Sequence, residues 1–238
     1  MSISLKRARA IFVKDYKEFS RNYAVSLLLI FPIIMALGLR GAPSDLTTAT
    51  FGLILNTSFV MLPSFAQACL IAEEKERNTL RSLMMTPATT VDVLIGKSSL
   101  VFVMSVVILA IATYLFGYEP VSIWAFVAAI LLSIILYTAA GTISGLFSKT
   151  VLEASFSIIP VLIVFTAVPY GGMLLMDDFP IFKALEFTPS IQLLHLLGIR
   201  NTHFTTGDLL KPLLIILAWT VVFTIASVVL YQRRLKDE

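Results

Sequence analysis

The sequence has little charge, one cysteine and two histidines. Only 14% of its 238 residues are charged, about half the share found in soluble domains. The single cysteine, Cys69, excludes an internal disulfide. The two histidines, His195 and His203, do not form the H-E-x-x-H pattern of a zinc protease. The scarcity of charge excludes an ordinary soluble domain and points to a membrane protein.

Charged residues are absent from six long apolar stretches. Each stretch meets or approaches the roughly 20 residues that a helix needs to cross the hydrocarbon core of a bilayer. Because backbone amides cannot stay unpaired in lipid, these stretches predict helices. We therefore expect one all-α transmembrane domain over residues 1–238. Its six predicted transmembrane helices are residues 22–39, 50–72, 98–118, 121–147, 154–176 and 211–232.

Three segments lie outside the predicted spans. Residues 1–21 place apolar side chains at helical spacing between basic ones, which predicts an amphipathic helix in the membrane interface. Residues 73–97 form a charged connector between spans two and three. Residues 177–208 predict a short extracytoplasmic helical hairpin. Of the 18 Lys and Arg residues, 14 lie in the terminal segments, the connector and the turn at Lys149. The positive-inside rule then puts both termini in the cytoplasm, and the net charge of +3 gives no reason to expect nucleic acid binding.

Helix breakers inside the spans predict local irregularity. Proline removes an amide donor and clashes with the preceding turn. We expect kinks or local unwinding at Pro32, Pro63, Pro160 and Pro169. In the fourth span, Gly141 and Gly145 are four residues apart, a spacing that lets a second helix approach closely.

The spans offer no ionisable group to bind a driving ion. Carriers coupled to protons or sodium place such groups inside their spans, so ion coupling is poorly supported. Asn56 and Gln67 are polar and can hydrogen-bond across helices. As an alternative, they could line a substrate pathway together with Pro160. Gly96-Lys97-Ser98 imitates a phosphate-binding loop, but Val91 occupies the position of its first glycine. If ATP drives this protein, a separate subunit must bind it.

The connector has the pattern of a short amphipathic helix that continues the second span. Leu80, Leu83 and Met84 form an apolar patch at helical spacing, and Thr86-Pro87 ends the helix. Such a helix, held between two membrane helices, can press into a groove on a soluble protein and transmit its motion.

The connector also resembles the signature of ABC-2 type transporter permeases. The matching residues are Glu74-x-Glu76-Arg77-Asn78-Thr79-Leu80, then Leu83, Thr86-Pro87 and Leu94-x-Gly96-Lys97. The chain departs from the family pattern at Asn78, where glycine is usual, and at Arg81, where an acid is common. The resemblance implies contact between the connector and a cytosolic ATPase. The implied contact residues are Glu73, Glu74, Glu76, Arg77, Leu80, Leu83, Thr86 and Pro87.

The resemblance further implies a complete exporter in a bacterial plasma membrane. Two permease chains, either identical or sister chains, would bind two ATPase subunits that hold ATP and Mg. The mostly apolar spans favour an amphipathic or hydrophobic cargo, such as an antimicrobial or toxin peptide, a drug or a lipid. No catalytic or metal site is expected in this chain itself.

Two other classes stay open. Glu73-Glu74-x-x-Arg77 resembles the E-E-x-x-x-R pattern of an intramembrane protease, but the arginine comes one residue early, which rotates it by about 100° on a helix. A passive membrane scaffold or channel would share the cytosolic connector but would lack ATP-dependent transport.

Overall fold

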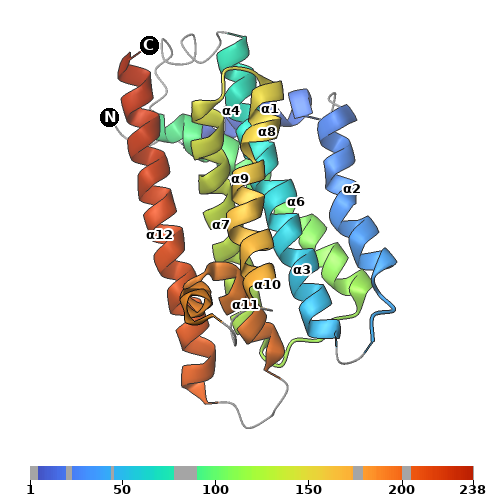
Figure 1. The fold of residues 1–238 in the computed structure, drawn as a ribbon. Helices are drawn as coiled ribbons and strands as arrows, with labels where there is room; N and C mark the ends of the chain where they lie inside the picture. Colours follow the sequence, from blue (N-terminus) through green and yellow to red (C-terminus); the bar gives the residue numbers. More distant parts are fainter. Residues whose placement is uncertain are drawn as a thin grey trace.

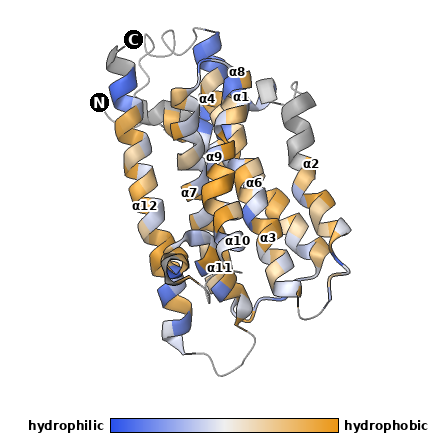
Figure 2. Cartoon of the chain, in the orientation of Figure 1, coloured by the Kyte–Doolittle hydropathy of each residue, from blue (hydrophilic) through white to orange (hydrophobic). Residues whose placement is uncertain are grey.

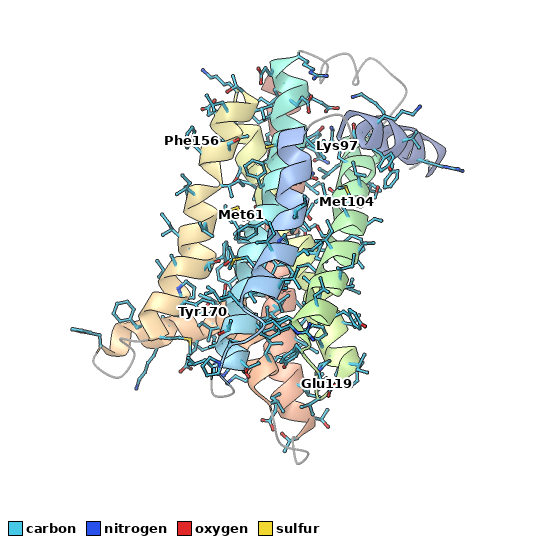
Figure 3. The ribbon with its side chains drawn as sticks, turned by 90° about the vertical axis from the view of Figure 1, so that its right-hand side faces the viewer. Met61, Lys97, Met104, Glu119, Phe156 and Tyr170 are labelled. Carbon is cyan, nitrogen blue, oxygen red and sulfur yellow. The ribbon has the colours of Figure 1, made fainter. Side chains whose placement is uncertain are left out.

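The long helices in the described part of the chain run roughly along a common axis and form a bundle, and α1 lies across one end of it (Figure 1 and Figure 3). The structure is a computed structural model that describes residues 5–19, 23–43, 46–77, 90–173, 179–199 and 205–237. Within these ranges every regular element is helical. Hydrophobic residues dominate the middle of the bundle, and hydrophilic residues gather at its two ends (Figure 2). This confirms the all-α fold for the described residues.

The elements follow one another with short connections. The first half comprises α1 (Leu5–Phe19), α2 (Tyr23–Gly38), α3 (Thr47–Phe59), the π-helical turn η1 (Val60–Ser64), α4 (Phe65–Glu76) and α6 (Thr90–Phe116). The second half comprises α7 (Ile123–Phe147), α8 (Val151–Ser157), α9 (Ile159–Leu162), the π-helical turn η2 (Ile163–Ala167), α10 (Val168–Met173), the 3-10 helix η3 (Pro180–Phe187), α11 (Pro189–Gly198) and α12 (Thr206–Asp237).

Five helical stretches in the described residues are long and apolar enough to cross a membrane. They are Thr47–Glu76, Leu94–Phe116, Ile123–Phe147, Val151–Met173 and Thr206–Arg234, and each overlaps one predicted span. The first predicted span corresponds to α2, whose 16 described residues fall short of the roughly 20 that a full crossing needs. The chain is therefore an integral membrane protein, while the six-span layout stays a prediction.

The two ends of the bundle differ in what they hold. One end contains α1, the last turn of α4, the start of α8 and the last turns of α12 (Figure 1); we call it the N/C end. The opposite end contains η3 and α11, and we call it the α11 end. The elements η3 and α11 both lie within the predicted outer hairpin, residues 177–208, so the described part of this hairpin is mainly helical.

Two of the membrane helices contain π-helical turns close to prolines. Pro63 lies inside η1, and η2 lies between Pro160 and Pro169. A π turn leaves backbone carbonyls without their usual helical donors, and Ser190 of α11 donates a hydrogen bond to the carbonyl of Phe165 in η2. Local irregularity near these prolines is confirmed. At Pro32, α2 continues as an α-helix without local unwinding, and a kink there stays a prediction.

Gly141 and Gly145 bring the backbone of α7 against η1 and α4, as their spacing predicts. A side-chain carbon on Gly141 would meet the backbone of Ser64, and one on Gly145 would lie 2.7 Å from the carbonyl oxygen of Ala68. No side chain separates the helices at these points. Close backbone contact of this kind is a main source of helix association in lipid, where no hydrophobic force drives helices together.

We therefore expect Gly141→Ala to destabilise the protein. Overpacking a close contact costs typically about 1–3 kcal/mol, which thermal unfolding in detergent can measure. Gly171→Ala is the matched control, because Gly171 also lies in a membrane helix and has no atom within 4 Å of the added carbon. Equal unfolding temperatures for the two variants would contradict the close contact.

Candidate coupling site at the N/C end

The last turn of α4 contacts three different parts of the protein through three consecutive residues. Glu74 faces α1 and α6. Lys75 donates hydrogen bonds of 2.7 Å to the carbonyl oxygens of Leu146 and Ser148, at the end of α7. The Glu76 carboxylate accepts a 2.9 Å hydrogen bond from the backbone amide of Val151, at the start of α8. Successive residues on an α-helix point about 100° apart, so one turn reaches all three neighbours.

Glu74 belongs to a group of two acids and two bases, which we call the ion cluster: Lys14, Asp15, Glu74 and Lys97. The Lys97 ammonium lies 2.9 Å from Glu74 Oε1 and 3.4 Å from Asp15 Oδ2. Its third neighbour is the backbone carbonyl of Leu70, at 3.4 Å. Figure 3 shows Lys97 at the N/C end, beside α1. The cluster therefore joins three elements, α1, α4 and α6.

Three members of the ion cluster are held away from water. The side chains of Asp15 and Lys97 are each 1% exposed, and that of Glu74 is 5% exposed, whereas the Lys14 side chain is 40% exposed. Burial raises the pKa of the Asp15 carboxyl, and the nearby Lys97 ammonium opposes this rise. Removing one partner of a buried ion pair typically costs about 3–5 kcal/mol, because the other charge is then left unpaired.

The predicted ATPase-contact residues divide into three groups. Glu73 and Arg77 form a 2.7 Å salt bridge with side chains 23% and 59% exposed, so they lie at the surface. Glu76 is at the surface too, but its carboxylate is engaged with α8. Glu74 is buried in the ion cluster, and its contact with the ATPase stays a prediction. Leu80, Leu83, Thr86 and Pro87 lie outside the described residues.

Comparison with protein families now adds to this geometry. The model of the family described as "ABC-2 family transporter protein" matches residues 10–234, almost the entire chain. The chain belongs to the ABC-2 transporter family. This confirms the resemblance seen in the connector, and members of this family are membrane transport subunits that normally work with ATPase partners. No curated protein matches the chain significantly.

The two polar residues suggested for a substrate pathway in this ABC-2 protein are buried and bonded to neighbouring helices. Asn56 donates to the carbonyl of Gly52 at 2.9 Å and to the Tyr170 hydroxyl at 3.1 Å. Gln67 donates to the hydroxyls of Ser98 and Thr142, at 3.3 and 3.2 Å. The bonds to Tyr170, Ser98 and Thr142 join different helices, and such interhelical hydrogen bonds are one of the two roles that the sequence suggests for Asn56 and Gln67. Pro160, in contrast, is exposed on the face of α9.

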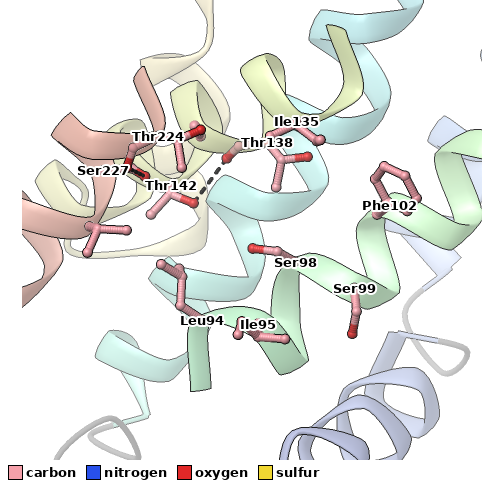
Figure 4. Close-up of a pocket in the computed structure, with 12 residues that line it drawn as sticks. Leu94, Ile95, Ser98, Ser99, Phe102, Ile135, Thr138, Thr142, Thr224 and Ser227 are labelled. Atoms are coloured by element: carbon pink, nitrogen blue, oxygen red, sulfur yellow. Dashed lines mark hydrogen bonds between the residues drawn. The ribbon is translucent and has the colours of Figure 1, made fainter. Parts of the chain in front are cut away.

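A groove of about 500 Å³ opens between α6, α7 and α12 (Figure 4), and its lining includes Ser98 and Thr142, the two residues that bond to Gln67. Its wall is almost wholly apolar, because hydroxyls such as those of Thr138 and Thr142 donate to carbonyls of their own helix. The lining residues are Leu94, Ile95, Ser98, Ser99, Phe102, Ile135, Thr138, Ala139, Thr142, Thr224, Ser227 and Val228. A hydrocarbon chain suits such a wall better than a charged solute does.

We expect the Gln67 amide to stabilise the bundle behind this groove. Gln67→Met should lower the free energy of unfolding modestly, since interhelical hydrogen bonds in membranes average about 0.6 kcal/mol each. A cycle of Gln67→Met, Thr142→Val and the double variant should show non-additive effects on the unfolding temperature, because the two side chains bond to each other. Additive effects would indicate that this hydrogen bond contributes nothing.

Proposed function

We propose that this ABC-2 protein is the permease subunit of an ATP-driven exporter. It would form the translocation pathway and receive mechanical work from separate ATPase subunits at the N/C end. The observation that carries the proposal is the last turn of α4, at the start of the connector. The Glu73–Arg77 ion pair lies at the surface there, and the three side chains between Glu73 and Arg77 reach α1, α6, α7 and α8. Force applied to such a turn is passed to most of the bundle.

The positions of the charges favour an external source of energy. In the five candidate spans, acidic and basic residues lie close to the helix ends: Ile123–Phe147 has none, and Thr206–Arg234 has them at both ends. Lys97, at the N/C end, is paired with Glu74 and Asp15. A gradient-driven carrier needs a titratable group that can bind and release its ion within the membrane. The ion-paired groups at this end are poorly suited to that role.

The cargo we propose is hydrophobic or amphipathic. The groove between α6, α7 and α12 supports this, since it has an apolar wall and lies among membrane helices. We further propose that the exporter contains two permease chains, identical or sister, with both termini of this chain in the cytoplasm of a bacterial cell.

We expect exchange of the charges at Glu73 and Arg77 to weaken binding of the ATPase without unfolding the helix. The double variant Glu73→Arg with Arg77→Glu keeps an i,i+4 ion pair but reverses both charges on the exposed surface. Like charges brought together at an interface cost several kcal/mol, so affinity should fall by at least about tenfold, which corresponds to about 1.4 kcal/mol. Co-purification with the partner ATPase subunit, followed by titration of the two subunits, measures this change in affinity.

Arg40→Glu is the control, because Arg40 is exposed and follows α2 towards the α11 end. This variant should bind the ATPase normally. Unchanged affinity in the double variant would remove Glu73 and Arg77 from the interface. If the unmodified chain bound no ATPase subunit, the proposed function itself would be refuted.

A further inference from the structure

From the ion cluster we propose that Lys97 is a positioning residue which makes α1 move together with the ATPase-contacting end of α4. This rests on the proposed function, because it names the route by which that site passes on its motion. The Lys97 side chain reaches from α6 to acids of both α1 and α4, and the half-exposed Lys14 of α1 adds a second contact to Glu74, at 3.4 Å. Its partner Asp15 lies 82 residues away in the sequence.

The position of Lys97 suits this role. It lies on α6, at the end of the connector (residues 73–97), and its partner Glu74 lies on α4, at the start of the connector. The ammonium therefore joins both ends of the connector. Through Asp15 it adds α1 as a third member of the same unit. A displacement of the connector cannot then move α4 or α6 without moving α1.

Apolar packing alone does not provide this constraint. Phe12 of α1 packs against a small apolar cluster formed by Ala66, Leu70, Leu100 and Val101. Such contacts are non-directional, so they hold α1 against the bundle but allow it to slide or rotate. Charged groups this deeply buried contribute little net stability over apolar ones, and their best-attested role is to fix one register. The ion cluster fixes α1 relative to α4 and α6 in this way.

Lys75 supplies a matched comparison within the same turn. It is also a lysine at the N/C end, but its ammonium bonds to the carbonyl oxygens of Leu146 and Ser148 on α7. Loss of Lys75 removes a tie between α4 and α7, whereas loss of Lys97 removes the buried tie to Asp15 of α1 and leaves only the partly exposed Lys14–Glu74 contact. The two lysines therefore separate a general loss of packing from a specific release of α1.

The test measures distances between spin labels in the complex of this chain with its ATPase. Replacement of the lone cysteine by Cys69→Ala allows labels at chosen sites. One pair, at Tyr16 and Val103, reports on α1 against α6, and a second pair, at Ile123 and His195, reports on the α11 end; all four residues are exposed. Distances are recorded without nucleotide and after trapping with ATP and vanadate.

In the protein with an unmodified ion cluster, we expect one narrow distribution of the α1–α6 distance in both states. The distance between the labels at the α11 end should change on trapping. In Lys97→Met, the α1–α6 distribution should broaden and the change at the α11 end should fall by at least half, while ATP hydrolysis persists. Lys97→Arg should restore both signals, because it keeps the positive charge. Lys75→Met should leave the α1–α6 distance narrow.

Each other outcome counts against the role of Lys97. A narrow α1–α6 distance and a full change at the α11 end in Lys97→Met would overturn it. So would equal broadening in Lys75→Met, which would show only a general loosening of the N/C end. Should Lys97→Met not fold, Asp15→Asn provides the same test from the α1 side. Failure of the parent chain to bind the ATPase would refute the proposed function, whereas the α1–α6 distance in the chain alone still tests whether Lys97 holds α1.

Discussion

A charge beside hydrocarbon must be paired, and this constraint arranges the N/C end of the protein. An isolated ionised group loses several kcal/mol of hydration when buried, so Lys97 can occupy its site only with Glu74 and Asp15 around it. The same requirement directs the Lys75 ammonium to two carbonyl oxygens at the end of α7. Polar groups that are costly to bury in a membrane thus bond the last turn of α4 to four other helices, α1, α6, α7 and α8.

The middle of the bundle depends on a different kind of contact. Lipid tails are as apolar as leucine, so association there relies on close packing and on hydrogen bonds between helices. Gly141 and Gly145 let α7 touch the backbone of η1 and α4, and Gln67 bonds to α6 and α7 on the same side of α4. The helix that carries the coupling site is consequently fixed along its length as well as at its end.

The sequence predicts features that depend on local pattern. Uncharged runs predict the membrane helices, and the spacing of Gly141 and Gly145 predicts a close approach because both depend on neighbours along one helix. The Glu73–Arg77 pair is an i,i+4 contact of the same kind. The Asp15–Lys97 contact spans 82 residues, so no local pattern reveals it. One signal was available: Asp15 lies four residues after the buried Ile11, on the apolar side of a helix in which most charged residues are basic.

The two π turns connect the coupling site with the far end of the bundle. The α3–η1–α4 helix ends in the coupling site, and the α8–η2–α10 helix begins beside it, where Val151 is bonded to Glu76. Each therefore runs from the N/C end towards the α11 end with one π turn on the way, and Ser190 of α11 bonds to the second. Because π turns are frequent at functional sites, the two turns are where we expect these helices to adjust if the proposed displacement of the N/C end is passed towards α11.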